Sequence, residues 1–427
     1  MILRKAAQLA GIRKTERMDP AALRDFQREA LQRALGRAYR TIPYYRERFD
    51  DAGLRPDGHT ELSSLPLTRR EDLAGVPLAQ RTSSDTPRAG LRLLRSSGTS
   101  GRPVELTCDR AHFNRRAAAI LHTLLVNGYR LRDDIACFER SPRQRRFPHP
   151  LLRFYHRVRI PFEAPIEEQA RQVHSMRPRV VLGYASWVAE VSRTLVELKL
   201  TDGLQPYLVV TNSEQLTEAM RDSIREAFHV EPTNVYDTWE FGNVAWQCPE
   251  RRGLHTNGSM LIVEILDAEG REVAPGESGE VVVTELHNRA APLLRYALGD
   301  RALRGGDGCP CGRQSPQIAE IQGRTSEVLV GADGRAMPAS VAVAGLMRSV
   351  AGVREYQVRQ RSPGQIELLL SLDARFGDRE ALQLENEFRR LFRIDDVELH
   401  RVARIERTEA GKLRPIVSEI EPSQTRH

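Results

Sequence analysis

The chain has 427 residues, 40% of them hydrophobic, and carries a formal net charge of +7 at pH 7. This length allows two or more domains with large cores, and no apolar run approaches the roughly 18 residues of a membrane span. Five unevenly spaced cysteines exclude a disulfide framework for a chain of this size. Residues 1–5 lead into a mixed polar stretch and not into a secretion-type apolar region, so we expect a cytoplasmic protein.

The first third of the chain is predicted to combine two helices with a β-hairpin. Apolar residues recur at helical spacing over 20–40, and a second helix is expected over 109–127, opened by Asp109. Residues 91–95 and 104–107 have the composition of strands. The segment between these two strands is therefore placed in a hairpin loop and not at a helix cap.

The middle of the chain alternates between strand and helix patterns. Strands are predicted at residues 180–184, 207–211 and 234–236, with helices at 187–198 and 218–228 between them. Strand, helix and strand at this spacing indicate a parallel sheet. Ligands of such sheets bind at the carboxyl ends of the strands, so we expect a single site there.

After residue 260 the pattern changes to all-β and then to a small α+β unit. Strands are expected at 261–266 and 279–286. The predicted elements of residues 325–427 are strands near 327–330, 355–360 and 366–372, a helix at 379–392, and a last strand at 396–402. The sequence therefore predicts an α/β fold with a separate, smaller C-terminal domain.

One segment is unusually rich in groups that can bind phosphate. Its residues are Ser96, Ser97, Gly98, Thr99, Ser100 and Gly101. Glycines let the backbone turn its N–H groups toward one point, and hydroxyls add further donors there. No Gly-Lys-Ser/Thr follows at the spacing of the common nucleotide loop, and a solvated Ser/Gly turn is the alternative interpretation.

Further motifs follow in order along the chain. They are YDTWE at 236–240, RYALGD at 295–300, GR at 323–324 and GK at 411–412. In this order, and together with the segment at 96–101, they resemble the adenylate-forming acyl-ligase superfamily, and within it the phenylacetate–coenzyme A ligase and CapK-like branch. The resemblance runs over nearly the whole chain, and the CPCGR segment at 309–313 is typical of the branch.

The resemblance implies an acetyl-CoA synthetase-like architecture, with a large multi-sheet N-terminal domain at 1–324 and a small, mobile α+β lid domain at 325–427. It also implies a two-step reaction that uses ATP and Mg²⁺. A carboxylate attacks the α-phosphate of ATP and releases pyrophosphate, and a thiol, usually coenzyme A, then captures the acyl-adenylate. Charge accumulates on the phosphates in the first step, so the site needs donors, a cation and a lysine.

By the same resemblance, several residues hold the adenosine. Tyr236 stacks on the adenine, Asp300 accepts both ribose hydroxyls, and Arg324 reaches the ribose from the domain border. The segment that lies against the adenine consists of Ser213, Glu214 and Gln215. A helix start is the alternative for this segment, and a turn residue is the alternative for Asp300.

The phosphates and the metal ion are assigned in the same way. The loop at 96–101 holds the β- and γ-phosphates, with Thr99 as a catalytic residue, and Glu240 binds Mg²⁺. Lys412 is carried by the lid and reaches the α-phosphate only when the lid closes. The chain has only four lysines and otherwise uses arginine, which supports a role for Lys412 that needs a compact ammonium group.

The chain departs from the family pattern in two of these motifs. Asp237 stands where a glycine is usual, and Trp239 where a Ser or Thr is usual, although Asp237 and Thr238 are still counted with the nucleotide-binding residues. The hydroxyl for the α-phosphate is therefore missing or comes from Thr238, and Trp239 is expected to narrow the acyl pocket. Ser326 replaces the acidic residue common at the hinge, but a pivot needs backbone freedom more than an acid.

Four residues form a candidate zinc site. They are Cys248, His255, Cys309 and Cys311, whose side chains suit a closed tetrahedral Zn²⁺. Similar sets recur in the branch that the chain resembles, which favours a structural zinc that joins loops. Reduced thiols in turns are the alternative, because Gly308 and Pro310 flank Cys309.

We therefore expect an AMP-forming ligase that converts a carboxylic acid into its coenzyme A thioester, with phenylacetate or another aryl acid as the family-weighted substrate. Two alternatives stay open: transfer of the acyl group to a carrier protein or amine, and a non-catalytic nucleotide-binding relic. The arginine-rich stretch at 140–159 would steer an anion or form a solvated surface, and no nucleic-acid partner is expected. A homodimer is a further possibility.

Overall fold

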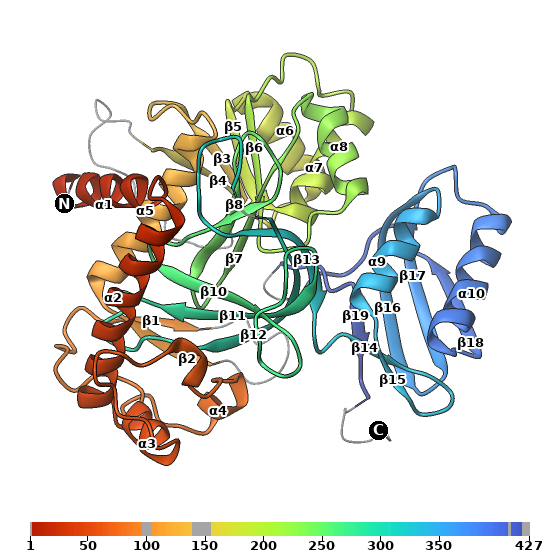
Figure 1. Ribbon diagram of the computed structural model, residues 1–427. Coiled ribbons are helices and arrows are strands. Elements are labelled where there is room, and N and C mark those ends of the chain that lie inside the picture. The colour runs from red at the N-terminus through yellow and green to blue at the C-terminus, as the bar shows by residue number, and fades with distance from the viewer. Residues whose placement is uncertain (1, 96–103, 139–154, 307, 409–410, 421–427) are drawn as a thin grey trace. The chain divides into compact units, whose positions relative to one another are not determined.

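The computed structural model describes residues 2–95, 104–138, 155–306, 308–408 and 411–420 of the chain. These residues group into two compact units. The first unit comprises residues 1–130 and 233–321, which are red to orange and green to teal in Figure 1, and the second comprises residues 131–232 and 322–427. No helix in the described ranges is long and apolar enough to cross a membrane.

The helices of the first unit are α1 (Ile2–Thr15), α2 (Pro20–Thr41), α3 (Pro43–Asp51), α4 (Arg70–Ala74) and α5 (Arg110–Val126), with a 3₁₀ turn at Leu62–Ser64. Helix α2 begins where Asp19 accepts a hydrogen bond from the Ala22 N–H at 2.9 Å, and it ends before Pro43. Helix α5 begins in the same way, because Asp109 accepts a hydrogen bond from the His112 N–H at 2.8 Å. Both predicted helices are confirmed.

The strands of the first unit form a sheet and a separate hairpin. The sheet has the order β10-β11-β12-β13-β9-β8-β7. Its strands are β7 (Thr233–Thr238), β8 (Gly242–Gln247), β9 (Leu254–Thr256), β10 (Leu261–Leu266), β11 (Ser278–Glu285), β12 (Tyr296–Arg304) and β13 (Gln317–Arg324). Strands β10 and β11 pair antiparallel, which confirms the all-β pattern predicted after residue 260. One apolar core joins Leu35 and Ile42 of the helical segment to Val244 and Val281 of the sheet.

The hairpin of the first unit is formed by β1 (Arg92–Arg95) and β2 (Glu105–Cys108), which pair antiparallel. It confirms the two strands predicted on either side of the hydroxyl-rich segment. The segment itself, residues 96–103, lies outside the described residues.

The N-terminal part of the second unit is a parallel α/β layer. Its elements are β3 (Ile135–Phe138), β4 (Arg157–Ile160), α6 (Ile166–Met176), β5 (Val180–Tyr184), α7 (Ala185–Glu197), β6 (Leu208–Asn212) and α8 (Glu218–Phe228). The strands have the order β6-β5-β3-β4, and every neighbouring pair is parallel. Val181 and Val209 are completely buried, as expected for strands covered on both faces. The predicted parallel sheet is confirmed here.

The C-terminal part of the second unit is a small α+β layer. Its elements are β14 (Val328–Val330), β15 (Ala336–Pro338), α9 (Ser340–Ser349), β16 (Val353–Ser362), β17 (Gln365–Leu372), α10 (Asp378–Phe392), β18 (Asp396–Arg401) and β19 (Ile416–Ser418). The main sheet has the order β18-β17-β16-β19, and α9 and α10 share a core with it around Leu368 and Phe388. The expectation that residues 396–402 form the last strand is wrong. Strand β19 follows and pairs parallel with β16.

The fold class predicted from the sequence, an α/β fold with an additional α+β part, is confirmed. The expected boundary between a core at 1–324 and a lid at 325–427 stays a prediction. In the division of the chain into compact units, residues 322–427 belong to the same unit as residues 131–232. We use the name lid segment for residues 322–427 from here on.

Candidate functional site

In the first unit, two residues from distant motifs share a hydrogen bond. The Tyr236 hydroxyl, at the end of β7, donates to Oδ2 of Asp300 on β12 at 2.6 Å. Asp300 is buried and lies within a strand, so the alternative that it is merely a turn residue is wrong. A carboxylate can accept several hydroxyl protons, as the predicted ribose contact requires.

The turn between β7 and β8, which carries Trp239 and Glu240, is held by a half-buried arginine of α5, Arg116. Nη2 and Nη1 of Arg116 donate to the carbonyls of Trp239 and Glu240 at 2.8 and 2.9 Å. Gly242 follows the turn with φ +73°, and a Cβ there would lie 2.9 Å from Nε of Arg116. Burial lowers the pKa of Arg116. The sequence analysis missed this residue, because nothing in its helical context separates it from the many other arginines.

Thr238, which precedes the same turn, binds a backbone group through its hydroxyl. Oγ1 of Thr238 accepts a hydrogen bond from the Phe241 N–H at 3.2 Å. The indole of Trp239 is 47% exposed within the described residues. The expectations that Thr238 supplies the α-phosphate hydroxyl and that Trp239 narrows the acyl pocket stay predictions.

In the second unit, Glu214 bridges two backbone segments. Its Oε2 accepts from the Ser186 N–H at 2.9 Å, and its Oε1 accepts from the Leu413 N–H at 2.6 Å. Burial raises the pKa of the Glu214 carboxyl. Ser186 begins α7 at the carboxyl end of β5, whereas Leu413 directly follows Lys412. The carboxylate predicted to lie against adenine therefore also holds the lysine segment.

The alternative that residues 213–215 start a helix is corrected by the structure. Ser213 has a left-handed backbone conformation with φ +64°, which does not continue into a helix. Helix α8 begins four residues later, where Oγ1 of Thr217 accepts a hydrogen bond from the Met220 N–H at 3.3 Å. Ser213 and Gln215 therefore belong to the loop at the carboxyl end of β6.

Lys412 lies against an aromatic ring at the carboxyl end of β5. Its Nζ is 5.6 Å from the centroid of the Tyr184 ring, within the range of a cation–π contact. The Lys412 loop is closed by its own hydrogen bonds. The Lys412 N–H donates to Oγ1 of Thr408 at 3.1 Å, and the Thr408 N–H donates to the Lys412 carbonyl at 2.9 Å. The predicted catalytic lysine is thus found where parallel sheets bind their ligands.

Arg324, at the end of β13 and near the start of the lid segment, lies beside a polar cluster. Oγ of Ser340 donates to Oε2 of Glu327 at 2.6 Å and lies 3.1 Å from the Arg324 carbonyl. Gly323 has φ +108°, and a Cβ there would lie 2.4 Å from Cβ of Ser340, so only glycine fits. Glu327, one residue beyond the position where the family has its acid, therefore orders this part of the chain. Arg324 as a ribose ligand stays a prediction.

The structure thus divides the predicted nucleotide-binding residues between the two units. The first unit carries Tyr236, Asp237, Thr238, Glu240 and Asp300, and the second carries Ser213, Glu214, Gln215, Arg324 and Lys412. Ser96, Ser97, Gly98, Thr99, Ser100 and Gly101 lie outside the described residues.

The four predicted zinc ligands meet at one point of the first unit. The ligand atoms of Cys248, His255, Cys309 and Cys311 all lie within 4.8 Å of one another. Sγ of Cys248 lies 3.8 Å from Sγ of Cys309, and Sγ of Cys311 lies 3.4 Å from Nε2 of His255. Thiolates about 2.3 Å from a tetrahedral ion are roughly 3.8 Å apart, so this spacing fits zinc.

The protonation of His255 also suits a metal ligand. Burial lowers its pKa to about 4, so the ring is neutral at pH 7 and can offer a lone pair. Nδ1 of His255 lies 3.3 Å from Oγ of Ser315, which orients the ring so that Nε2 faces the sulfurs. The donor set therefore matches a structural site of three Cys and one His.

Comparison with known proteins finds ligases among the sequences that are similar to this chain. No family model matches it. It is 28% identical over 328 residues to the phenylacetate–coenzyme A ligase of Thermus thermophilus and 27% identical over 331 residues to that of Pseudomonas putida, covering 72% of this chain and 72% of each relative. Protein CapK of Staphylococcus aureus is 25% identical over 130 residues, 30% of this chain and 27% of the relative.

Solved structures agree in fold. A 2-hydroxyisobutyryl-CoA ligase in its postadenylation state, bound to an acyl-adenylate, matches with a TM-score of 0.78 at 19% identity over 95% of this chain and 91% of that chain. An anthranilate CoA ligase bound to anthranoyl-AMP matches with a TM-score of 0.55 at 18% identity, over 78% and 67% of the two chains. The protein thus has the fold of the adenylate-forming acyl-CoA ligases. Within this class its sequence is similar to phenylacetate–coenzyme A ligases, which confirms the resemblance predicted from the motifs.

Proposed function

We propose that the protein is an AMP-forming acid–thiol ligase that adenylates a carboxylic acid with ATP and transfers the acyl group to coenzyme A. The observation that carries this proposal is the position of Lys412, whose loop is held by Glu214 at the carboxyl end of β5. A mobile ammonium beside a parallel-sheet ligand site is the group that adenylation needs at the α-phosphate. The names of the sequence relatives support the same reaction.

In this mechanism, each predicted residue stabilises or orients charge. The Lys412 ammonium neutralises the attacking carboxylate and the α-phosphate oxygens as the new C–O–P link forms and pyrophosphate leaves. Glu240 would hold Mg²⁺, which when bound would offset the charge of the phosphates. The loop at 96–101, with Thr99, is proposed to donate to the β- and γ-phosphates. Asp300 and Arg324 hold the ribose, and Tyr236 stacks on the adenine.

The acid is proposed to be phenylacetate or another aryl acid, because the sequence relatives are named for phenylacetate. The structural relatives widen this choice, since one is named for the small aliphatic acid 2-hydroxyisobutyrate and another for anthranilate. Transfer to a carrier protein or an amine is the alternative second step. We propose a cytoplasmic enzyme that acts on a free acid.

A structural zinc is proposed for the site of Cys248, His255, Cys309 and Cys311. When bound, the ion would join the end of β8 and strand β9 to the loop at 309–311, which are distant in sequence. All four positions are occupied by protein ligands, which leaves no open position for catalysis. The ion would therefore have a structural role, joining these segments of the first unit.

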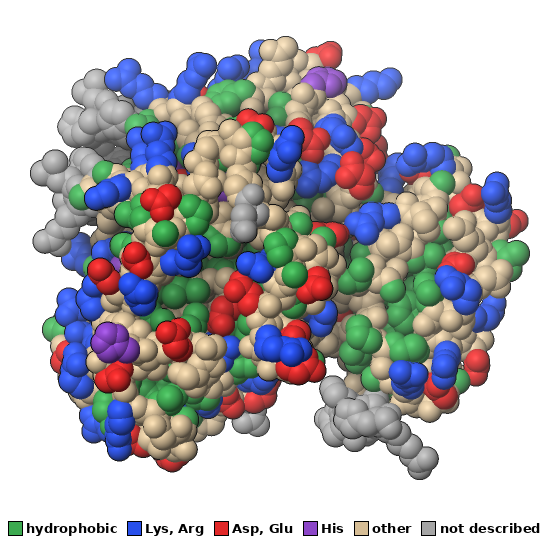
Figure 2. All heavy atoms as spheres, in the orientation of Figure 1, with side chains coloured by type: hydrophobic (Ala, Val, Ile, Leu, Met, Phe, Trp, Pro, Cys, Tyr) green, Lys and Arg blue, Asp and Glu red, His purple; other side chains and the backbone are tan. Residues whose placement is uncertain are grey.

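The face of the molecule shown in Figure 2 gives no support to a nucleic-acid interface. Lys and Arg side chains are interspersed there with Asp and Glu over the described residues, so the arginine excess forms no continuous basic surface on that face. Among the described residues, arginines also form ion pairs at exposed positions, such as Arg225–Asp222 and Arg390–Glu387.

The test is acid-dependent exchange of pyrophosphate into ATP, measured with a panel of aryl and aliphatic acids. Exchange with at least one acid, lost in Lys412→Ala and kept in Lys199→Ala, supports the proposal. Lys199 is the matched control, because it is an exposed lysine of the same unit. Addition of coenzyme A should then give a thioester. No exchange with any acid would instead favour a non-catalytic nucleotide-binding protein.

A further inference from the structure

A buried arginine connects the lid segment to helix α7. The Arg407 side chain is 6% exposed, and its Nη2 lies 2.9 and 3.1 Å from the two carboxylate oxygens of Glu355 and 3.2 Å from Oε2 of Glu190. Glu190 belongs to α7, whereas Glu355 and Arg407 belong to the lid segment. Nε and Nη1 of Arg407 are buried without a hydrogen-bond partner among the described residues. Its charge therefore depends on these two carboxylates.

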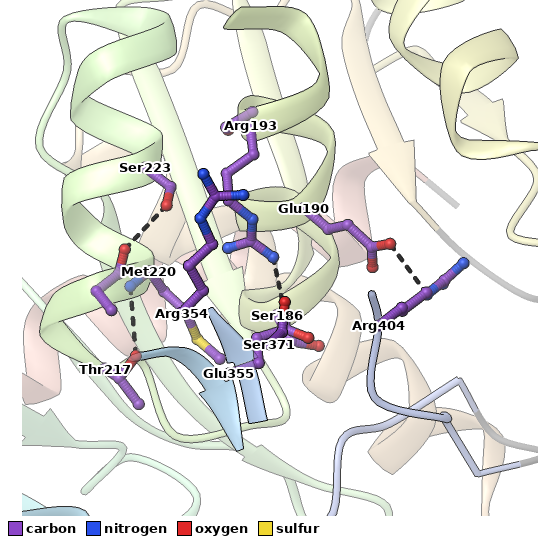
Figure 3. A network of polar contacts seen from close by, with 12 residues as sticks. Ser186, Glu190, Arg193, Thr217, Met220, Ser223, Arg354, Glu355, Ser371 and Arg404 are labelled. Atoms are coloured by element: carbon purple, nitrogen blue, oxygen red, sulfur yellow. Dashed lines mark hydrogen bonds and ion pairs between the residues drawn. The ribbon is translucent and has the colours of Figure 1, made fainter. Parts of the chain in front are cut away.

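The same carboxylates take further arginines, so positive and negative groups alternate across the contact. Glu355, whose side chain is 2% exposed, also binds Nη2 of Arg193 on α7 at 2.9 Å. Glu190 also binds Nε of Arg404 in the lid segment at 2.9 Å. Figure 3 shows Arg193 and Glu190 extending from α7 toward Glu355 and Arg404. We call Glu190, Arg193, Glu355, Arg404 and Arg407 the charge network.

One member of the charge network, Arg407, lies shortly before the predicted catalytic lysine in the chain. Thr408 follows Arg407 and closes the Lys412 loop through its Oγ1 and its N–H. On the other side of the loop, the Leu413 N–H donates to Glu214. The loop that carries Lys412 is thus held at both of its ends to the segment formed by β5, α7 and the loop after β6.

We propose that Glu190 and Glu355 are positioning residues, which through Arg407 fix the Lys412 loop for the adenylation step. This inference rests on the proposed function. A buried cation that loses one of its carboxylates is left uncompensated, so the docked arrangement is favoured only while both acids are ionised and in place. Small displacements of a reacting group are costly, so weaker docking lowers the rate of the step that uses Lys412.

The experiment compares Glu190→Gln and Glu355→Gln with Glu197→Gln. These two network variants keep the shape of the side chain and remove its charge. Glu197 is the matched control, because its 3.3 Å pair with Arg354 joins α7 to β16 like the network, but both side chains are exposed, at 60% and 38%. An exposed pair contributes little, so Glu197→Gln should behave like the wild type.

Two kinetic measurements distinguish a loss of Lys412 positioning from a general loss of folding or activity. We expect kcat of the acid-dependent exchange to fall about 10- to 100-fold in each network variant, with a smaller change in KM for ATP. Thioester formation from supplied acyl-adenylate and coenzyme A should stay within about threefold of the wild type, because that step does not need Lys412 at the phosphate. Glu355→Asp, which restores the charge, should recover part of the exchange activity.

Hydrogen exchange gives a measurement that does not depend on catalysis. In the wild type the amide of Leu413 should be protected, and both network variants should lose this protection while Glu197→Gln keeps it. Wild-type exchange kinetics together with unchanged protection in the network variants would overturn the inference. Equal losses in the adenylation and thioester steps would also overturn it, in favour of a purely structural role. If the wild type itself shows no acid-dependent exchange, the proposed function fails, and the protection of Leu413 still decides whether the network docks the loop.

Discussion

Oε1 of Glu214 lies 2.6 Å from the backbone nitrogen of Leu413, the residue that follows Lys412. The carboxylate comes from the loop after β6, and the amide comes from the lid segment, 199 residues further along the chain. Because the second carboxylate oxygen binds the Ser186 N–H at the start of α7, one side chain aligns the two segments that meet at the carboxyl end of β5. Glu214, which is predicted to bind the nucleotide, therefore also holds two backbone segments together.

Replacement of Glu214 by Gln should impair adenylation. The amide of Gln offers one acceptor oxygen where the carboxylate offers two, so one of the two backbone N–H groups is left without its partner. We expect kcat for acid-dependent pyrophosphate exchange to fall about 10-fold or more, equivalent to about 1.4 kcal/mol. Steady-state exchange kinetics test this, and unchanged kcat in a folded Glu214→Gln would contradict the assigned contact.

Replacement of Tyr236 by Phe should weaken nucleotide binding without abolishing catalysis. The ring remains for stacking, but Asp300 loses the hydroxyl that donates to its Oδ2. Loss of one hydrogen bond to a buried carboxylate corresponds to about 1 to 2 kcal/mol, which predicts a KM for ATP raised roughly 5- to 30-fold. Asp300→Asn should have the larger effect, because it leaves one acceptor oxygen in place of the two that are predicted to receive the ribose hydroxyls. The prediction is wrong if Asp300→Asn leaves KM for ATP unchanged.

Replacement of Arg116 by Met should loosen the turn that carries Glu240. The carbonyls of Trp239 and Glu240 lose their donors, at a cost of about 2 kcal/mol in the free energy of unfolding. We also expect a higher Mg²⁺ concentration for half-maximal activity, since the backbone of the proposed ligand is no longer held. Arg110→Met, at an exposed position of the same helix, is the control. Denaturant unfolding and a Mg²⁺ titration measure the two effects.

Metal content should distinguish the zinc site from unligated thiols. We expect about one zinc per untagged chain in the wild type and clearly less in Cys311→Ser, because a closed site needs all four ligands. Cys108→Ala removes a buried thiol outside the site and should retain the metal. Elemental analysis together with thermal unfolding tests this. A wild type without stoichiometric zinc removes the proposal.

The stability of the first unit should depend on pH through His287. Burial lowers the pKa of His287 to about 4, and its Nε2 lies 3.1 Å from the Ser259 carbonyl. Between the ordinary pKa of 6.5 and about 4, the unfolded chain binds more protons than the folded one, so stability falls as the pH falls. The stabilisation is complete above pH 6.5, and its loss at acidic pH amounts to about 3 kcal/mol.

Urea unfolding at pH 7 and pH 5 measures this dependence. His287→Gln should reduce the slope without removing it, because Gln does not titrate, whereas His255, whose pKa is also lowered to about 4, still does. His400→Gln, at an exposed position, should keep the slope of the wild type. An equal slope in His287→Gln and the wild type would show that other groups cause the dependence.

For helices and strands with strong local sequence signals, the predicted first and last residues lie within about two residues of the observed ones. Helix α8 was predicted at its observed bounds, because Thr217 can cap it and its apolar side chains recur on one face. The four predicted zinc ligands lie close together in the structure. They could be predicted because few residue types bind zinc and the chain has only five cysteines.

Elements that depend on tertiary contacts were missed. Strand β19 has three residues, Ile416–Ser418, and exists only through its parallel pairing with β16. Helix α9 is apolar around most of its surface and contains Gly345, so its sequence shows little helical contrast. The charge network could not be predicted from the sequence either, because its arginines and acids follow no pattern that distinguishes them from ordinary surface charges.

The contact between Lys412 and Tyr184 offers a way to measure the position of the lid segment by chemical labelling. With so few primary amines in the protein, mass spectrometry can follow each one separately after treatment with an acylating reagent. An ammonium that rests on a phenol ring is shielded from such a reagent, whereas Lys199 is open to it. The ratio of the two labelling rates would therefore test, without any engineered probe, whether the lid segment leaves Tyr184 during turnover, as the predicted mobile lid requires.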